Sequence, residues 1–266
     1  MPTLGRLLVI GVLTLLPRGA GATVSITTCG TAVPEQGIGV LAADLACSAN
    51  APSVTLANRA TLDLAGYTLT HDSYQPAVQC EGARCAVLSS VAGGTIVTLA
   101  TAIIGNRVGV SDCAIDVTST TTAGDVVNAF RITATNVQVS NATSAAFLGL
   151  KIRATNVDLV DCWVGFFALS QLRGDVVTVT GGAYGINAAK RARVSGLAIH
   201  GAGYYGVRAR SVRLIDADVT GNGTFGPGGA DLATERRPIL VNTACGTSQV
   251  LTDPPGTVTW GVCQND

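Results

Sequence analysis

The sequence contains few of the residue types on which most catalytic, metal and cofactor sites depend. Its 266 residues include two histidines and one methionine, and only 13% of them are charged. It contains no CxxC pair, phosphate loop, nucleotide fingerprint or nucleic-acid module. Both histidines, His71 and His200, lie where turns are expected, and we interpret them as structural. Zinc is therefore disfavoured, and the sequence predicts no metal, no cofactor and no nucleic-acid partner.

Helical periodicity and interdomain linkers are also missing. Apolar residues do not recur at the three- and four-residue spacing of a helix in the repeat region, and no Pro- or Ser-rich stretch divides the chain. Glycine, in contrast, is abundant, with 32 residues. This composition is typical of a single turn-rich β domain.

No apolar run is long enough to span a membrane comfortably. The longest, from Leu7 to Leu16, follows Arg6 and precedes the small residues Ala20-Gly21-Ala22. This order of segments is typical of a secretory signal with its cleavage site. The sequence predicts a signal peptide at residues 1–22, a mature domain at 23–266 and export to the periplasm, the cell surface or the medium. The alternative is an uncleaved anchor.

The sequence does contain a repeat of about twenty residues with a basic residue at a fixed phase. RITATNVQVSN, which begins at Arg131, matches KIRATNVDLVD, which begins at Lys151. The same phase continues from Gln171, Arg191 and Ser211. Within each unit apolar residues alternate with polar ones, which is the period of a β-strand. A repeat of this length predicts a solenoid.

A twenty-residue unit of short strands fits one coil of a β-helix. Coils stacked at roughly 4.8 Å would turn the apolar positions into continuous internal ladders. Asn136 and Asn156 fall in matching ATN turns, where asparagine tolerates the left-handed conformation and can hydrogen-bond to its copy in the next coil. A second turn is marked by a glycine after an aromatic or apolar residue: Val164-Gly165, Tyr184-Gly185, Tyr205-Gly206 and Phe225-Gly226.

The repeat resembles the right-handed parallel β-helix superfamily, which is also called pectin-lyase-like. TCGTAVPEQGIGVLAADLACS and SVTLANRATLDLAGYTLT are similar to the first coils of many secreted β-helix proteins. The resemblance covers roughly residues 26 to 240. It implies an all-β, single-stranded right-handed parallel β-helix solenoid of about eight to ten coils, with Asp44 and Asp63 as structural residues of the N-terminal cap. Because one fold hosts many activities, it says little about function.

Eight cysteines in an exported chain indicate disulfides. Proximity in the sequence suggests Cys29 with Cys47 in the N-terminal cap, Cys80 with Cys85 in the CEGARC loop, and Cys245 with Cys263 in the C-terminal tail. Cys113 and Cys162 remain. If they lie two coils apart in the same phase, they are too far apart to bridge. Free buried thiols are one interpretation of this last pair, and its state stays open.

The basic residues concentrate in the repeat region. Between Arg131 and Arg213 there are ten basic and three acidic residues, a net charge of +7, although the whole chain has 17 of each sign. Equal phase in a solenoid means equal side, so these cations should form a stripe. Its predicted members are Arg131, Lys151, Arg153, Arg173, Arg191, Arg193 and Arg213.

A stripe of like charges on adjacent strands costs stability, which suggests that a ligand offsets the repulsion. Arginine donates in a fork that suits carboxylate and sulfate groups. The sequence therefore predicts an acidic polysaccharide lying along the coil axis. The alternative is that the arginine stems cover apolar ladder edges while their heads stay solvated.

Aromatic residues gather at the glycine turns. They are Trp163, Tyr184, Tyr204, Tyr205 and Phe225. Their repetition with the turn glycine favours ladders packed inside the coil, and the alternative is an exposed platform for sugar rings. Of the consecutive pair Phe166 and Phe167, one is expected inside and one outside.

Carboxylates could make the protein an enzyme on polyuronates. By resemblance, β-helix lyases use an Arg or Lys base, often with calcium, and the hydrolases use grouped aspartates. Asp158, Asp161 and Asp175 lie near the stripe, and Asp216 and Asp218 face the same way on one strand. No stretch matches the hydrolase motifs, and Asp158 and Asp175 could equally be counter-ions for Arg153 and Arg173. We assign no catalytic residue.

The sequence thus predicts an exported, non-catalytic β-helix protein of the surface, envelope or matrix that binds acidic polysaccharide along its arginine stripe. Long loops that would wall a cleft are scarce, which disfavours an enzyme. The alternatives are a polysaccharide lyase or glycoside hydrolase acting on polyuronates, and a purely structural solenoid. An enzyme would gather carboxylates and a base in one groove, and a structural protein would neutralise the stripe with its own aspartates.

Overall fold

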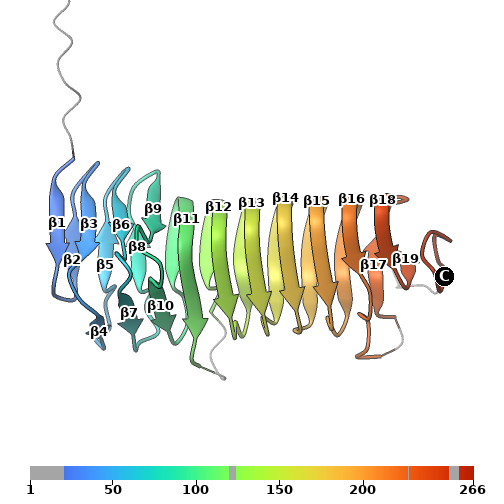
Figure 1. Ribbon diagram of the computed structural model, residues 1–266, viewed down its shortest axis with the longest axis horizontal. Coiled ribbons are helices and arrows are strands. Elements are labelled where there is room, and N and C mark those ends of the chain that lie inside the picture. Colours follow the sequence, from blue (N-terminus) through green and yellow to red (C-terminus); the bar gives the residue numbers. More distant parts are fainter. Residues whose placement is uncertain (1–20, 120–123, 227, 252–257) are drawn as a thin grey trace, which may run out of the picture.

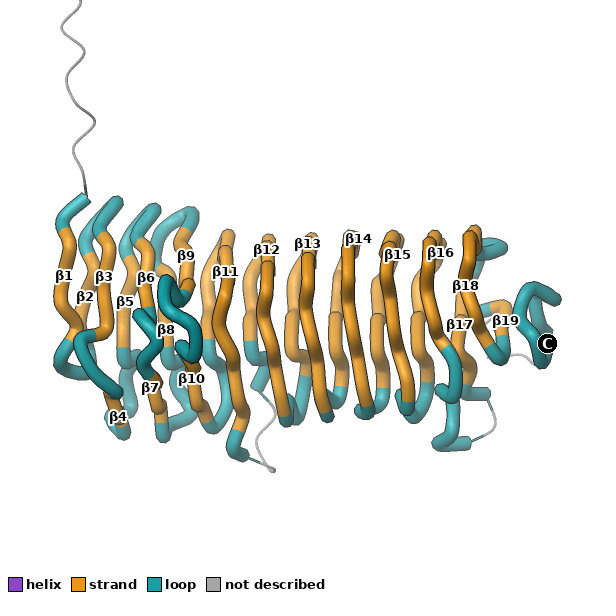
Figure 2. Tube along the Cα trace, in the orientation of Figure 1, coloured by secondary structure: helices purple, strands orange, loops and turns teal. Residues whose placement is uncertain are grey.

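The chain forms an elongated β-solenoid. The computed structural model describes residues 21–119, 124–226, 228–251 and 258–266, and all regular structure in these ranges is β. The strands stack side by side along one long axis, with β1 at one end and β19 near the other (Figures 1 and 2). Of the predicted signal peptide, all but residues 21–22 lies outside the described ranges. The described ranges contain no apolar helix of membrane-spanning length.

Nineteen strands build the solenoid, and all the strand pairings are parallel. Ten short strands form the N-terminal coils: β1 (Thr23–Ile26), β2 (Thr31–Val33), β3 (Ile38–Leu41), β4 (Leu45–Cys47), β5 (Val54–Leu56), β6 (Thr61–Asp63), β7 (Thr68–His71), β8 (Val78–Cys80), β9 (Cys85–Leu88) and β10 (Thr95–Thr98). Six long strands follow: β11 (Ile103–Val117), β12 (Val127–Ser140), β13 (Ala145–Val160), β14 (Val164–Thr180), β15 (Tyr184–His200) and β16 (Tyr205–Val219). The last three are β17 (Ala230–Thr234), β18 (Ile239–Cys245) and β19 (Ser248–Val250).

The strand register carries one position of the coil through the whole solenoid. That position is occupied in turn by Thr23, Ile38, Thr61, Ala86, Gly109, Thr133, Arg153, Arg173, Arg193, Arg213 and Ile239. The solenoid therefore has about 11 turns, slightly more than the eight to ten predicted. The period of twenty holds only from Thr133 to Arg213, so the coils outside that range escape a fixed-period comparison.

The predicted apolar columns form the core. Alternation along each strand turns Ile132, Ile152 and Leu172 inward on successive coils, and all three are buried. Phe147 and Phe166 also stack inside, with ring centroids 5.4 Å apart, while Phe167 is half-buried on the wall. Full burial of each large apolar side chain contributes about 1.5–3 kcal/mol.

One corner of the coil is a ladder of left-handed residues. The series is Asp112, Asn136, Asn156, Val176, Gly196, Asp216 and Asn242, with φ between 48° and 58°. Side-chain amides link neighbouring coils: Asn136 donates to Asp112 (2.7 Å), Asn156 to Asn136 (2.9 Å) and Asn242 to Asp216 (3.0 Å). The predicted role of the ATN asparagines is confirmed by these bonds.

A second turn requires glycine because adjacent coils approach closely there. A Cβ on Gly165, Gly185 or Gly206 would lie 2.5–2.7 Å from a backbone oxygen of the next coil. The predicted continuation of this series at Phe225-Gly226 is wrong, because Gly206 is followed in its column by Asp231 (Tyr205 pairs with Ala230). This coil is longer than twenty residues, since Tyr205 and its partner Ala230 are 25 positions apart, and Gly226 lies exposed in the extra segment.

The N-terminal coils are held by two disulfides and two aspartates. The structure pairs Cys29 with Cys47 and Cys80 with Cys85, as proximity suggests. Asp44 accepts a hydrogen bond from the Thr68 amide (2.8 Å), and Asp63 accepts from the amides of Ala65 and Ser90 (2.8 Å each). Both aspartates therefore fix turns. Cys113 and Cys162 are free and buried, and they occupy different phases of the coil.

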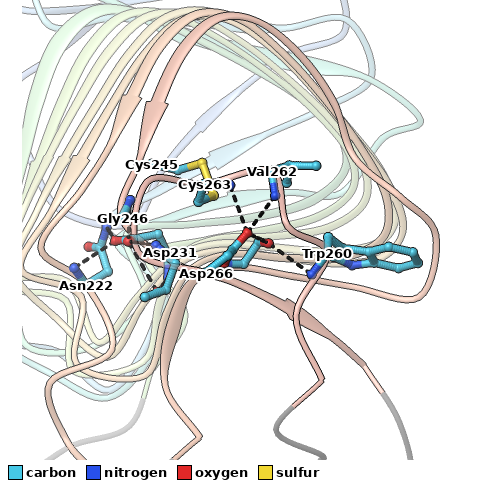
Figure 3. The surroundings of a disulfide bond; sticks show 10 residues. Asn222, Asp231, Cys245, Gly246, Trp260, Val262, Cys263 and Asp266 are labelled. Atoms are coloured by element: carbon cyan, nitrogen blue, oxygen red, sulfur yellow. Dashed lines mark hydrogen bonds between the residues drawn. A yellow bond between two sulfur atoms is a disulfide. The ribbon is translucent and has the colours of Figure 1, made fainter.

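The C-terminal end is closed by its own tail (Figure 3). The disulfide between Cys245 and Cys263 ties the tail to β18, and the Gln264 amide donates to the Cys245 carbonyl (3.0 Å). The Asp266 carboxylate accepts hydrogen bonds from the amides of Val262 (2.7 Å) and Cys263 (2.8 Å) and from Ser248. Partial burial raises the pKa of Asp266, but these hydrogen bonds outweigh it and leave the pKa below its usual value.

Candidate functional site

The strand register brings the predicted stripe residues into two adjacent columns. In the first column Arg131 pairs with Lys151, Lys151 with Gln171, and Gln171 with Arg191. The second column lies two residues further along each strand and contains Arg153, Arg173, Arg193 and Arg213. Because an inward residue separates the columns, both present their side chains on the same face, and all seven cations are exposed.

The first column extends well beyond the predicted residues. Arg107 pairs with Arg131, and the register of the preceding coils places Arg84 and Arg59 below it. At the other end, Arg237 lies two residues before Ile239, the partner of Arg213. Each of these four arginines is exposed. The two columns together hold eleven of the fifteen described Lys and Arg residues: Arg59, Arg84, Arg107, Arg131, Lys151, Arg153, Arg173, Arg191, Arg193, Arg213 and Arg237.

These four arginines were missed because their coils are longer than twenty residues. Arg84 and Arg107 are 23 positions apart, and Arg107 and Arg131 are 24 apart. A comparison at fixed period passes over them. The available signal was the match of RVGV at Arg107 to RITA at Arg131, in which the apolar residues alternate in the same order.

The carboxylates in the described part of the chain leave the two columns unneutralised. Over the described residues, the salt bridges within 4.0 Å are Arg210–Glu235 (3.2 Å) and His200–Asp218 (3.9 Å). Neither involves a cation of the columns. Asp175, two residues after Arg173, instead accepts a hydrogen bond from Ser195 Oγ (2.7 Å). The counter-ion interpretation of Asp158 and Asp175 is therefore not supported.

Three hollows follow one another along the columns. One of about 380 Å³ lies between Arg84, Arg107 and Arg131. The next, of about 350 Å³, is lined by Arg131, Lys151, Arg153, Gln171 and Arg173. The third, of about 340 Å³, continues from Arg173 to Arg193 and Arg213. Neighbouring hollows share Arg131 or Arg173, so they form a series that follows the coil axis.

The aspartates considered for catalysis are dispersed. Asp216 sits in the left-handed corner and accepts from Asn242, while Asp218 accepts from Thr220 Oγ1 (2.8 Å). Asp158 lines a separate, larger hollow of about 990 Å³ on another wall. Asp161 lines yet another hollow, together with Trp163. The residues lining the 990 Å³ hollow include no Lys, Arg or His. Neither hollow therefore places a basic side chain beside its aspartates.

The aromatic residues at the glycine turns lie outside the coil, so their interpretation as internal ladders is wrong. Trp163 is 49% exposed and Phe225 58%. Tyr184 and Tyr204 stack on each other with centroids 5.3 Å apart, and Phe225 meets Tyr204 edge-on at 5.5 Å. Because the rings of Tyr184 and Tyr204 stack on each other, their faces are covered, and they stabilise the outer turns more than they offer a surface for sugars.

His71 is a structural histidine, as predicted, whereas the side chain of His200 is 45% exposed. His71 is 1% exposed, and its ring nitrogens are bonded to Ser53 Oγ (2.7 Å) and Ser73 Oγ (2.9 Å). Ser53 is buried too, so this serine–histidine pair is closed to any substrate. Burial lowers the pKa of His71. His200 lies at the surface and contacts the Thr220 carbonyl (3.2 Å).

Metal ligation and relatives give no further guide. Within the described ranges, no three His, Cys, Asp or Glu side chains gather as a metal would require. Comparison of the chain with protein-family models, with curated proteins and with solved structures finds no match. The candidate site therefore depends on the geometry of the two cation columns alone.

Proposed function

We propose that the protein is an exported, non-catalytic β-solenoid that binds an extended acidic polysaccharide along its two cation columns. The observation that carries the proposal is the alignment of Arg153, Arg173, Arg193 and Arg213 on successive coils without a carboxylate within 4.0 Å of them in the described chain. A second cation column runs beside them.

The energetic argument starts from the repulsion within each column. Like charges on adjacent coils stand about 4.8 Å apart at the backbone, where two unit charges interact by about 1 kcal/mol in water and by several times that at a protein surface. The long side chains can splay apart, which reduces the cost. A bound polyanion removes it, and forked arginine donors match carboxylate and sulfate geometry.

The shape of the site favours a chain over a small ligand. From Arg59 to Arg237 the first column crosses eight coil spacings, about 38 Å in total. The hollows along the two columns follow one another and do not enclose a single centre. A flexible polymer with one acidic group per sugar can follow such a line, and each added contact multiplies the affinity.

Export is the part of the proposal that the cysteines support. Three disulfides are compatible with an oxidising compartment, and the predicted signal peptide would direct the chain there. The resemblance to pectin-lyase-like β-helix proteins points to the same compartment. A surface, envelope or matrix component fits this combination, and acidic glycans are abundant polyanions outside cells.

The test is co-sedimentation of the mature protein with polygalacturonate and with alginate across a salt series. We expect binding at low salt that weakens steeply as salt rises, because the contacts are ionic and exposed. Replacing Arg153, Arg173 and Arg193 together by Gln should weaken binding about tenfold or more. The matched control, with Arg208, Arg210 and Arg236 changed to Gln, carries the same net charge and should bind nearly as the wild type does.

Three outcomes separate the candidate functions. Equal losses in both triple variants would reduce the effect to net charge and contradict a defined site. Absence of binding at low salt would leave a purely structural solenoid. Release of unsaturated or reducing chain ends during the incubation would establish a lyase or a hydrolase instead.

A further inference from the structure

An exposed apolar patch lies on the wall next to the first cation column. Phe130 is 53% exposed and Leu169 51%, and between them Leu150 is half-buried. The register makes Phe130 a neighbour of Leu150, and a bulge after Gly149 sets Leu169 opposite Leu150 on the next coil. A parallel column contains the half-buried Leu148 and Phe167, which pair directly.

Cations border this patch on two sides. Along the corner, Phe130 is followed directly by Arg131 and Leu150 by Lys151, and both cations are exposed. Towards the C-terminal coils the apolar columns give way to polar and charged residues. Phe167 pairs with Asn187, and Asn187 pairs with Arg208 on the next coil. Lys190 comes directly after Ala189 in the sequence. None of these four cations has a carboxylate within 4.0 Å in the described chain.

The patch is a flat wall and not a pocket. It consists of parallel strands stacked in register, and Phe130, Leu148, Leu150, Phe167 and Leu169 line none of the hollows described above. Its partner must therefore be extended and flat. Contiguous exposed apolar area of this kind marks an interaction surface.

Charge decides which flat partner fits. In a symmetric dimer through this patch, the bordering cations of the two copies would face each other or crowd the same rim, and they would repel. An anionic lipid surface satisfies both features, because headgroups neutralise the cations while the leucine and phenylalanine side chains enter the boundary with the acyl chains.

We infer that this wall is a docking surface for the face of an anionic lipid bilayer, with Phe130, Leu150 and Leu169 as the apolar contacts and Arg131, Lys151, Lys190 and Arg208 as headgroup contacts. The second cation column, from Arg153 to Arg213, lies on the adjacent wall and stays free. The protein would then hold an acidic polysaccharide beside a membrane, although the lipid site itself does not depend on the polysaccharide proposal.

The experiment is sedimentation of the mature protein with phosphatidylglycerol vesicles and with phosphatidylcholine vesicles. We expect binding to the former and little to the latter. The double variant Phe130→Ser and Leu169→Ser should bind phosphatidylglycerol about tenfold more weakly, since two half-exposed apolar side chains no longer leave water. The control Tyr74→Ser and Val91→Ser removes apolar groups elsewhere that are at least as exposed, and it should bind as the wild type does.

A second measurement does not require a variant that loses lipid binding. Phe130→Trp introduces a reporter into the patch, and vesicles containing brominated lipid should quench its added fluorescence. Thermal unfolding of all variants shows whether each is folded. The Phe130→Ser, Leu169→Ser variant should keep its binding to polygalacturonate, so a failure of either proposal is visible without the other.

Three results would overturn the inference. One is failure of the wild type to sediment with phosphatidylglycerol vesicles at low salt. Another is equal binding by the apolar double variant and the wild type, which would assign the effect to the cations alone. The last is a concentration-dependent dimer that the double variant abolishes and that forms without any lipid binding, which would make the patch a self-association surface.

Discussion

The side-chain amide of Asn156 donates a hydrogen bond to Oδ1 of Asn136 on the preceding coil, with an N···O distance of 2.9 Å. Both residues hold the left-handed conformation, with φ of 50° and 54°. The next coil places Val176 at the same corner with φ of 53°. A β-branched residue is the least suited to this conformation, so Val176 interrupts an otherwise favourable ladder.

Val176→Asn should therefore stabilise the protein. Asparagine tolerates the left-handed region and can join the amide ladder, so we expect the free energy of unfolding in urea to rise by about 1 kcal/mol. The matched control is Val91→Asn, because Val91 is equally exposed but does not have a positive φ. A gain at Val91 as large as that at Val176 would contradict the strain argument.

The repulsion within the second cation column is open to a direct test. Arg173 lies between Arg153 and Arg193, so Arg173→Gln should raise the free energy of unfolding by about 0.2–1 kcal/mol at low ionic strength. The gain should shrink as salt is added, because screening already weakens the repulsion in the wild type. Urea titrations at several salt concentrations measure both effects.

The control for that experiment is Arg236→Gln, which removes an exposed cation outside the two columns. It should change stability little at any salt concentration. If Arg173→Gln instead destabilised the protein equally at low and high salt, its stem would act by covering apolar surface.

The two free cysteines should be inert in the folded protein. Burial raises the pKa of Cys113 to about 12, with a further contribution from Asp112, and burial likewise raises the pKa of Cys162 to about 11. The thiolate is the reactive form. Ellman's reagent at pH 8 should therefore find no thiol in the native protein and two after unfolding in urea without a reductant.

Single variants assign the two thiols. Cys113→Ala and Cys162→Ala should each leave one reactive thiol in urea. Four or more reactive thiols in the wild type would show that one of the three disulfides is absent, and none would show that Cys113 and Cys162 are paired.

Stability should fall in mild acid because of His71. Burial lowers the pKa of His71 below its ordinary value of 6.5, so the unfolded chain binds the proton more readily than the folded one does. Its contribution is complete above pH 6.5 and is lost as the pH falls from 6.5 towards the lower pKa of the folded state. Urea titrations between pH 8 and pH 5 should show this decline.

Substitution of each histidine identifies the source of that decline. His71→Asn should flatten the pH dependence between 6.5 and 5, even though it lowers stability overall by disturbing Ser53 and Ser73. His200→Gln should leave the slope as in the wild type. The opposite pattern would show that the surface histidine is responsible.

Most of the fold follows from local chemistry that the sequence displays. Alternation along each unit predicts strands, and equal phase on successive coils predicts the buried column of Ile132, Ile152 and Leu172 and the exposed column of Arg153 and Arg173. Stacking at strand spacing allows little else once the period is known. The turn asparagines were predictable because few residues accept the left-handed conformation.

The sequence repeat does not predict column membership where coils differ in length. It also does not tell whether a residue that recurs once per coil lies inside or outside the coil. Arg84 and Arg107 join the first cation column from coils that are longer than twenty residues. Phe147 and Phe166 stack inside the coil, while Tyr184 and Tyr204 stack outside it. One aromatic residue per coil is the pattern of both arrangements, so the sequence does not distinguish them.

The sequence by itself determined the solenoid, its internal ladders and the alignment of the arginines, because each depends on a repeat that stacking converts into a column. Only the tertiary structure decided that, among the described residues, no aspartate lies within 4.0 Å of a column cation, since Asp175 bonds Ser195 and not Arg173. It also decided that Phe130 and Arg131 are both exposed. Strand alternation would put one of two consecutive residues inside, but at a corner of the coil the wall changes direction and both side chains point outwards.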